Sequence, residues 1–136
     1  MVEKQIIVAC GLIRKGKKIL LAKRHSKSKF QGGKWEMSGG KIAIFENPKD
    51  TLMRELEEEL GIKVKVGELF DVVDVILENE EEKRHVILIA YLCDWLSGEP
   101  RTIECEEVVW LEKKDLKGLD FTVGTKPFIK KYLQPN

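Results

Sequence analysis

Apolar residues recur along much of the chain with the short period of β-strands. Runs of mostly apolar residues between charged or glycine-containing turns predict strands, because a strand buried in a sheet needs apolar side chains. These runs cover Ile6–Ile13, Ile19–Ala22, Val64–Phe70, Val72–Leu77, Arg84–Cys93 and Val108–Leu111, with a further short strand from Trp35 to Gly40. The polar segment His25–Lys34 has no such period and is predicted to be a mobile loop. Asn79–Glu82 is predicted to be the tip of a hairpin.

Two segments have the longer period of an amphipathic helix. The first should span Pro48–Leu60, because proline suits the first helical position. Asn47 can cap this helix, and Gly61 can adopt the left-handed conformation that ends it. The second candidate covers Thr125–Leu133, where apolar residues stand at helical spacing. Strands outnumber the helices and interleave with them, which predicts the α/β fold class, with a mixed β-sheet sandwiched between α-helices.

Composition and charge exclude several classes of protein. The chain has 136 residues, and its 24 Lys plus Arg against 23 Asp plus Glu give a net charge of +1. No excess of positive charge therefore favours a nucleic acid or an anionic membrane as partner. A hydrophobic content of 43% with 35% charged residues excludes a disordered chain. The length suits one domain over residues 1–136.

Three further features bear on the cell compartment. The longest apolar run, Val86–Cys93, is far shorter than the ~20 residues of a membrane-spanning helix. The segment Met1–Gln5 carries an acid where a signal peptide would have basic and then apolar residues, so we expect a cytoplasmic protein. The 3 cysteines form no CxxC pair and are interpreted as reduced, structural thiols.

A group of carboxylates marks one face of the first predicted helix. Glu55, Glu58 and Glu59 are related by i,i+3 and i,i+4 spacing, so their side chains are neighbours. Adjacent like charges repel by about 0.2–0.5 kcal/mol for each exposed pair. A hard divalent cation such as Mg²⁺ would compensate this repulsion, because it prefers oxygen ligands. The alternative interpretation is an acid-rich, solvated helix face.

The residues before this helix favour the metal-binding interpretation. Gly39 and Gly40 end the short strand that starts at Trp35, and a bare backbone there can offer a carbonyl oxygen to a metal ion. Together with the helix they complete a spaced motif, whose members are Gly40, Glu46, Arg54-Glu55-Leu56, Glu58-Glu59 and Gly61-Ile62. This motif is the Nudix box, and the chance of meeting it at a given starting point is about 10⁻¹⁰. The sequence therefore resembles the Nudix hydrolases, and its flanks are most similar to the MutT-type branch.

The resemblance implies a Nudix fold and a specific reaction. MutT-type enzymes hydrolyse nucleoside triphosphates, oxidised or non-standard ones among them, to the monophosphate and pyrophosphate, and so cleanse the nucleotide pool. By this resemblance Mg²⁺, or Mn²⁺ in its place, is held by the carbonyl of Gly40 and by Glu55, Glu58, Glu59 and Glu104. Glu104 is included for its spacing to Trp110 and is otherwise a solvated loop acid. The resemblance also implies that either Glu55 or Glu58 is the general base.

The resemblance also implies residues that bind the nucleotide. Arg24 stands at the end of the second strand, where the family often contacts phosphate, and Arg84 matches an arginine that touches the nucleotide. Glu36 borders the pocket, and Thr125 takes the place of an asparagine that reads the base. Each residue also has an alternative role without substrate contact: an exposed strand end for Arg24, a strand carboxylate outside the pocket for Glu36 and a helix cap for Thr125. A threonine hydroxyl cannot offer the paired donor and acceptor of an amide.

Two departures from the family pattern lie close to the motif. Ser38 replaces the usual proline, and Phe45 replaces the glycine that commonly precedes the motif glutamate.

Arg54 and Glu46 are interpreted as a pair that orients the metal ligands. Within the family that the chain resembles, ADP-ribose hydrolases usually carry a proline beyond the motif. No proline stands between Pro48 and Pro100, so the resemblance disfavours this subclass.

Several alternatives remain open at this stage. The chain could act on another nucleoside diphosphate derivative or be a non-catalytic Nudix module that senses a nucleotide. An oxidised purine and a cytidine-type nucleotide are both compatible with the sequence. So are a monomer and a homodimer.

Overall fold

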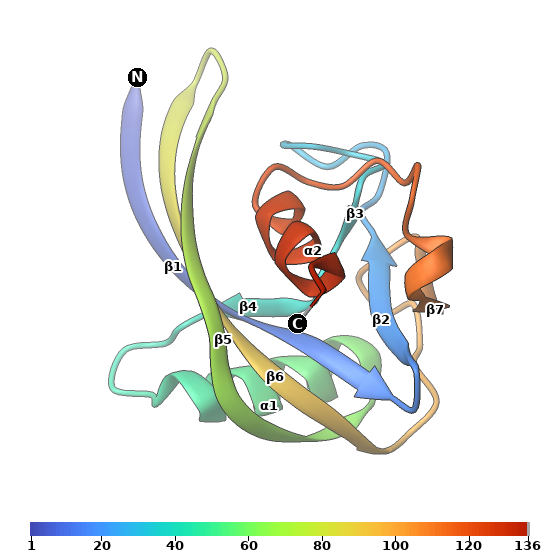
Figure 1. Ribbon diagram of the computed structural model, residues 1–136. Helices are drawn as coiled ribbons and strands as arrows, with labels where there is room; N and C mark the ends of the chain where they lie inside the picture. Colours follow the sequence, from blue (N-terminus) through green and yellow to red (C-terminus); the bar gives the residue numbers. More distant parts are fainter. Residues whose placement is uncertain (136) are drawn as a thin grey trace.

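The computed structural model describes residues 1–135, and a seven-stranded sheet forms its centre (Figure 1). The elements in chain order are β1 (Val2–Lys15), β2 (Lys18–Lys23), β3 (Trp35–Glu36), β4 (Gly39–Lys41), α1 (Pro48–Leu60), β5 (Lys63–Glu78), β6 (Glu82–Ser97), β7 (Glu107–Glu112), the 3₁₀ turn η1 (Lys113–Asp115) and α2 (Thr125–Leu133).

Strand β1 is the centre of the sheet. It pairs in parallel with β6 and antiparallel with β2 and β4, so the sheet is mixed, as predicted. Strand β5 completes one side by antiparallel pairing with β6, and β2 is flanked by β3 and β7 on the other side. In Figure 1 the long strands β1, β5 and β6 extend together past the rest of the molecule at the upper left.

The two helices cover opposite faces of this sheet (Figure 1). Helix α1 packs its apolar face into one core together with residues of β1 and β5. Members of this core include Leu52, Leu56, Leu60, Ala9, Ile13 and Val64. Helix α2 buries Phe128 and Ile129 in a second core, together with Cys10, Leu12, Ile19 and Leu21. Alternate residues of one strand serve the two cores, because successive side chains in a strand point to opposite faces. The predicted α/β sandwich is confirmed.

The ends of α1 follow the local signals in the sequence. The Asn47 side chain accepts a hydrogen bond from the backbone N–H of Lys49 at 2.9 Å, and Pro48 occupies the first turn. Gly61 ends the helix with φ 71°, in the left-handed region that favours glycine. The predicted bounds of both helices are confirmed.

Two strand predictions are wrong. The segments Val64–Phe70 and Val72–Leu77 form one strand, β5, whose pairing with β6 shifts register between Val66 and Leu69 and again between Leu69 and Asp71. A bulge adds a residue without ending a strand, and its break in alternation resembles a strand end in the sequence. The segment from Trp35 to Gly40 is two strands rather than one, because β3 pairs with β2 and β4 pairs with β1.

Other sequence predictions concern smaller features. At the hairpin tip the Asn79 side chain accepts hydrogen bonds from the backbone N–H groups of Glu81 and Glu82, each at 2.9 Å, so the predicted turn is confirmed. The cysteines are free thiols, and burial raises the pKa of Cys93 to about 12. Within residues 1–135 there is no helix whose length and apolar character would let it cross a membrane.

Candidate active site

A cavity of about 320 Å³ lies where the extended strands meet the start of α2. One wall is apolar and is formed by alternate residues of β1, β5 and β6, namely Ile6, Val8, Val75, Leu77, Val86 and Leu88. The polar lining includes Arg24, Glu36, Gly40, Glu59, Arg84, Glu104 and Thr125. Every site residue predicted from the sequence therefore lines this cavity except Glu55 and Glu58.

Acidic side chains gather at one end of the cavity. Glu59 of α1 lies beside Glu55 of the same helix and beside Glu104, which precedes β7. Burial raises the pKa of Glu59 to about 9, and hydrogen bonding and charge repulsion from Glu55 and Glu104 add to this shift. Burial is thus the main cause of the raised pKa, and the neighbouring carboxyl groups of Glu55 and Glu104 raise it further.

Arg54 connects the loop before α1 to the acidic face of the helix. Its Nε and Nη2 atoms donate to the two carboxylate oxygens of Glu46 at 3.0 and 2.9 Å. Its Nη1 atom donates to Glu55 at 3.2 Å and to Glu58 at 3.0 Å. These bonds from Arg54, and a 2.7 Å bond from the Thr51 hydroxyl, lower the pKa of Glu46 to about 2. The side chain of Glu58 is 59% exposed, so Arg54 holds it at the rim of the site.

The acidic end has the donor set of a site for a hard divalent cation. Carboxylate oxygens come from Glu55, Glu59 and Glu104, and the backbone of Gly40 lies against Glu55. Within residues 1–135, no three acidic, histidine or cysteine side chains already converge as a complete ligand group. The residues nevertheless fit such an ion, because hard divalent cations take oxygen ligands, and the ion would offset the repulsion of Glu59 by Glu55 and Glu104.

Arg24 and Glu36 form an ion pair on the cavity wall. Nη1 of Arg24 donates to both oxygens of Glu36, at 3.3 and 3.1 Å, and its Nε donates to the carbonyl of Phe30 at 3.1 Å. Burial raises the pKa of Glu36, and the charge of Arg24 opposes this shift. Arg24 is thus paired within the wall, rather than being the solvated strand end that was the alternative.

Thr125 is buried at the first position of α2, and its contacts differ from those of a helix cap. The capping position belongs to Gly124, and no side chain caps the helix. The hydroxyl oxygen of Thr125 accepts hydrogen bonds from the Thr122 hydroxyl at 2.8 Å and from the backbone N–H of Met37 at 3.4 Å. Thr125 therefore joins the start of α2 to the segment between β3 and β4 while it lines the cavity.

The sequence reasoning missed residues that shape the remaining wall. The guanidinium of Arg84 lies 4.8 Å from the ring centroid of Phe30, and both residues line the cavity. Glu82, which the sequence predicts only as part of a hairpin tip, is 2% exposed and accepts a hydrogen bond from Arg84 at 2.7 Å. One signal was available, since residues two apart in a strand share a face and Glu82 stands two positions before Arg84.

Comparison with known proteins gives consistent results. The NUDIX domain family matches residues 3–132. The chain is 32% identical, over 94% of its length, to the 8-oxo-dGTP diphosphatase of Escherichia coli (strain K12), of which it covers 96%. It is 35% identical, over 82% of its length, to the CTP pyrophosphohydrolase of the same strain, of which it covers 79%. A MutT NUDIX hydrolase from Burkholderia pseudomallei has a similar structure, with a TM-score of 0.81, 32% identity and coverage of 93% of this chain and 97% of that one.

Proposed function

This chain belongs to the Nudix family and is a Nudix pyrophosphohydrolase, and on that premise we propose that it hydrolyses a nucleoside triphosphate to the monophosphate and pyrophosphate. A single Nudix domain over residues 1–136 is part of this proposal. The observation that carries it is one cavity whose apolar wall suits a base and whose far end gathers Glu59 and Glu104. A nucleotide that spans the cavity would place its phosphates at the acidic end.

We propose Mg²⁺ as the cofactor, with Mn²⁺ as an alternative. When bound, such an ion polarises phosphate oxygens and lowers the pKa of bound water. Glu55, Glu59, Glu104 and the Gly40 carbonyl would hold it, and Glu58 would complete the set from the rim. Arg54 keeps Glu55 and Glu58 in fixed orientations through Nη1, which reduces the reorganisation needed for the reaction.

The predicted site residues would also accept a proton from the attacking water and bind the nucleotide. Of the two candidates for general base, Glu55 is favoured, because it lies beside Glu59 whereas Glu58 is 59% exposed. Arg24 and Arg84 would approach the phosphates or sugar from the wall, and Glu36 and Thr125 would meet the base.

The names of two relatives define the substrates to test first. Because similar enzymes are an 8-oxo-dGTP diphosphatase and a CTP pyrophosphohydrolase, we propose that the substrate is an oxidised purine or a cytidine nucleotide. The experiment incubates the protein with 8-oxo-dGTP, dGTP, CTP or ADP-ribose in Mg²⁺ and separates the products. We expect a nucleoside monophosphate and pyrophosphate from at least one triphosphate. Release of inorganic phosphate alone, or turnover of ADP-ribose only, contradicts the proposal.

A matched pair of variants tests the metal site. Glu59→Gln keeps the size of the side chain but removes its charge, so turnover should fall by about 100-fold. Glu57→Gln is the control, since Glu57 is an exposed residue of the same helix outside the motif. Equal turnover in the two variants would remove Glu59 from the metal site.

A further inference from the structure

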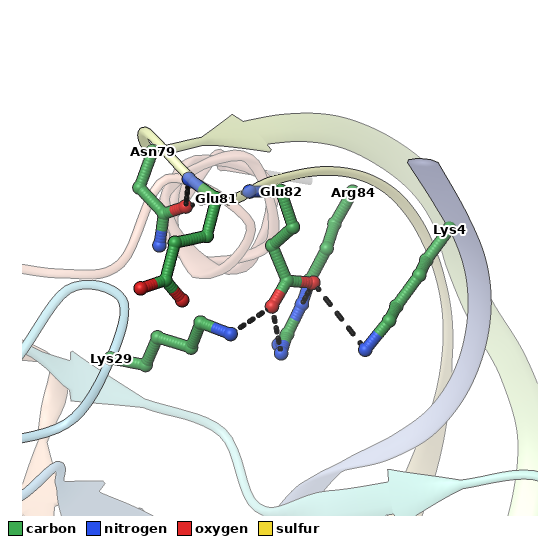
Figure 2. Close-up of polar contacts among 6 residues, drawn as sticks. All are labelled: Lys4, Lys29, Asn79, Glu81, Glu82 and Arg84. Atoms are coloured by element: carbon green, nitrogen blue, oxygen red, sulfur yellow. Dashed lines mark hydrogen bonds and ion pairs between the residues drawn. The ribbon is translucent and has the colours of Figure 1, made fainter. Parts of the chain in front are cut away.

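A buried carboxylate binds three cations at the start of β6 (Figure 2). Glu82 accepts hydrogen bonds from Nε and Nη2 of Arg84, at 2.7 and 3.3 Å, and from the ammonium group of Lys29. The ammonium group of Lys4 lies 3.7 Å from one of its oxygens. The side chain of Glu82 is 3% exposed, and the three cations come from β1, from the loop between β2 and β3, and from β6.

The cluster acts on the cavity through Arg84. Glu82, Lys29 and Lys4 do not line the cavity, whereas Arg84 and Phe30 do. Glu82 engages one edge of the guanidinium, Nε and Nη2, and leaves the Nη1 edge for other partners. The same guanidinium lies 4.8 Å from the centroid of the Phe30 ring, so it is fixed from two sides.

Charge also distinguishes this cluster from a simple structural ion pair. One carboxylate faces three cations, so the group carries excess positive charge beside the cavity. Replacing a buried ion pair by apolar residues often leaves the free energy of unfolding unchanged. A contribution to stability therefore does not by itself explain the presence of this cluster. Excess positive charge next to a cavity suits an anionic ligand.

We propose that Glu82 is a positioning residue for nucleotide binding: it holds the Arg84 guanidinium and the Lys29 loop in place, so that Arg84 contacts the anionic nucleotide from the cavity wall. This inference rests on the proposed function. Glu82 itself touches no substrate, and it influences binding only through the cations that it orients.

The test compares Glu82→Gln with the neighbouring Glu81→Gln. Glu81 is exposed, and its carboxylate takes no part in the ion pairs drawn in Figure 2. With 8-oxo-dGTP and CTP as substrates, Glu82→Gln should raise KM about tenfold and change kcat less than about threefold, because the acidic end of the cavity is untouched. Glu81→Gln should leave both constants within about twofold of wild type. A loss of folded protein would instead lower the apparent kcat at constant KM.

A double-mutant comparison tests whether Glu82 affects nucleotide binding through Arg84. In the Arg84→Ala background, Glu82→Gln should change KM by less than about twofold, because the residue that it orients is gone. The same tenfold rise in both backgrounds would overturn the assignment. If Glu82→Gln does not fold, Glu82→Asp replaces it, since it keeps the charge but withdraws the carboxylate from Arg84. An unchanged KM in Glu82→Asp would also overturn the assignment.

Binding separates this inference from the proposed function. The dissociation constants of 8-oxo-dGMP and CMP, measured by calorimetry, do not depend on turnover. If wild-type protein binds a monophosphate but hydrolyses no triphosphate, the proposed function fails, and the Glu82 assignment is judged on a tenfold weaker dissociation constant in Glu82→Gln. If wild-type protein neither binds nor hydrolyses these nucleotides, both are overturned.

Discussion

Gly40 packs so closely on Glu55 that a Cβ atom on residue 40 would lie 2.3 Å from Cδ of the Glu55 carboxyl group. This contact joins the strand β4 to the acidic face of α1, two segments whose relative position sets the acidic end of the cavity. The absence of a side chain at residue 40 is therefore a geometric requirement of the site and explains why the motif begins with glycine.

Gly40→Ala should abolish most of the activity. The added methyl group must displace the Glu55 carboxyl group, and a displacement of about 1 Å in a catalytic group costs roughly 100-fold in turnover. The measurement is kcat with the best nucleotide of the panel. Gly67→Ala is the control, because its Cβ would meet only the Leu92 carbonyl oxygen at 3.1 Å, and its kcat should stay within about threefold. Normal turnover in Gly40→Ala would contradict the close packing at this contact.

Glu104 and Glu106 should differ in their contribution to catalysis. Glu104 raises the pKa of Glu59, whereas Glu106 forms an ion pair with Lys23 at 3.6 Å. Glu104→Gln should lower turnover by tenfold or more and raise the Mg²⁺ concentration for half-maximal rate, as expected for a lost ligand. Glu106→Gln should change neither by more than about twofold. Titration of the rate with Mg²⁺ decides, and matching effects in the two variants would exclude Glu104 from the metal site.

Thr125 should limit how strongly the enzyme distinguishes 8-oxo-dGTP from dGTP. Its hydroxyl oxygen already accepts hydrogen bonds from Thr122 and from the backbone of Met37. A hydroxyl offers a base fewer groups than an amide, and one lost hydrogen bond to a buried polar edge is worth about 1–3 kcal/mol, or roughly tenfold to a hundredfold in selectivity. Thr125→Asn should therefore raise the ratio of kcat/KM for the two nucleotides, and Thr125→Val is the control of similar shape. Strong selectivity in wild type, unchanged in Thr125→Asn, would assign base reading to another residue.

The local signals of the sequence predicted α1 and the motif on it, because their causes are local. The cap at Asn47 and the left-handed Gly61 act within one turn of the helix ends. The spacing of Glu55 and Glu59 likewise fixes their common face without reference to the rest of the fold.

The buried cluster at Glu82 could not be predicted in the same way. Its surroundings depend on the pairing of β1 with β6 and on the loop between β2 and β3, which bring Lys4 and Lys29 to a residue far along the chain. The sequence shows a run of acids at a hairpin tip, for which an exposed position is the ordinary expectation, and the spacing of Glu82 and Arg84 indicates a shared face but not its burial. The register shifts in β5 are hidden for a similar reason, since they depend on the partner strand.

The stabilising effect of Glu82 should disappear in acid. Hydrogen bonds from Arg84 and then Lys29 lower its pKa to about 2 from an ordinary value of 4.5, and Lys4 lies nearby. A carboxyl group with a lowered pKa in the folded state contributes stability that is complete above about 4.5 and is lost as the pH falls towards 2. The free energy of unfolding of Glu82→Gln should therefore be below that of wild type at pH 7, and the gap should shrink by pH 3. Denaturant unfolding at both pH values measures this, with Glu81→Gln as control. A gap that is constant with pH would mean that the ionised carboxylate is not what stabilises the fold.

Phe45 should be replaceable by glycine with a gain in stability. It has φ 65°, in the left-handed region, and its side chain is fully exposed, so it contributes no packing to offset the strain. This conformation costs a residue other than glycine about 1–2 kcal/mol, and Phe45→Gly would remove that cost. Glycine loses more conformational entropy on folding, which offsets about 0.5–1 kcal/mol of the stabilisation. Phe45→Gly should then raise the free energy of unfolding by about 0.5–1 kcal/mol and Tm by roughly 2–4 °C. Turnover should be unchanged, because the adjacent Glu46 keeps its bonds to Arg54.

Ile44 provides the matched control for this backbone effect. Its side chain is 85% exposed, and its φ is not positive, so Ile44→Gly relieves no strain and only adds freedom to the unfolded chain. That variant should lose about 0.5–1 kcal/mol of stability, the opposite sign to Phe45→Gly. Thermal unfolding of the two variants beside wild type gives the comparison. Two shifts of the same sign would show that exposed side-chain area, rather than the left-handed backbone at Phe45, determines the stability of this loop.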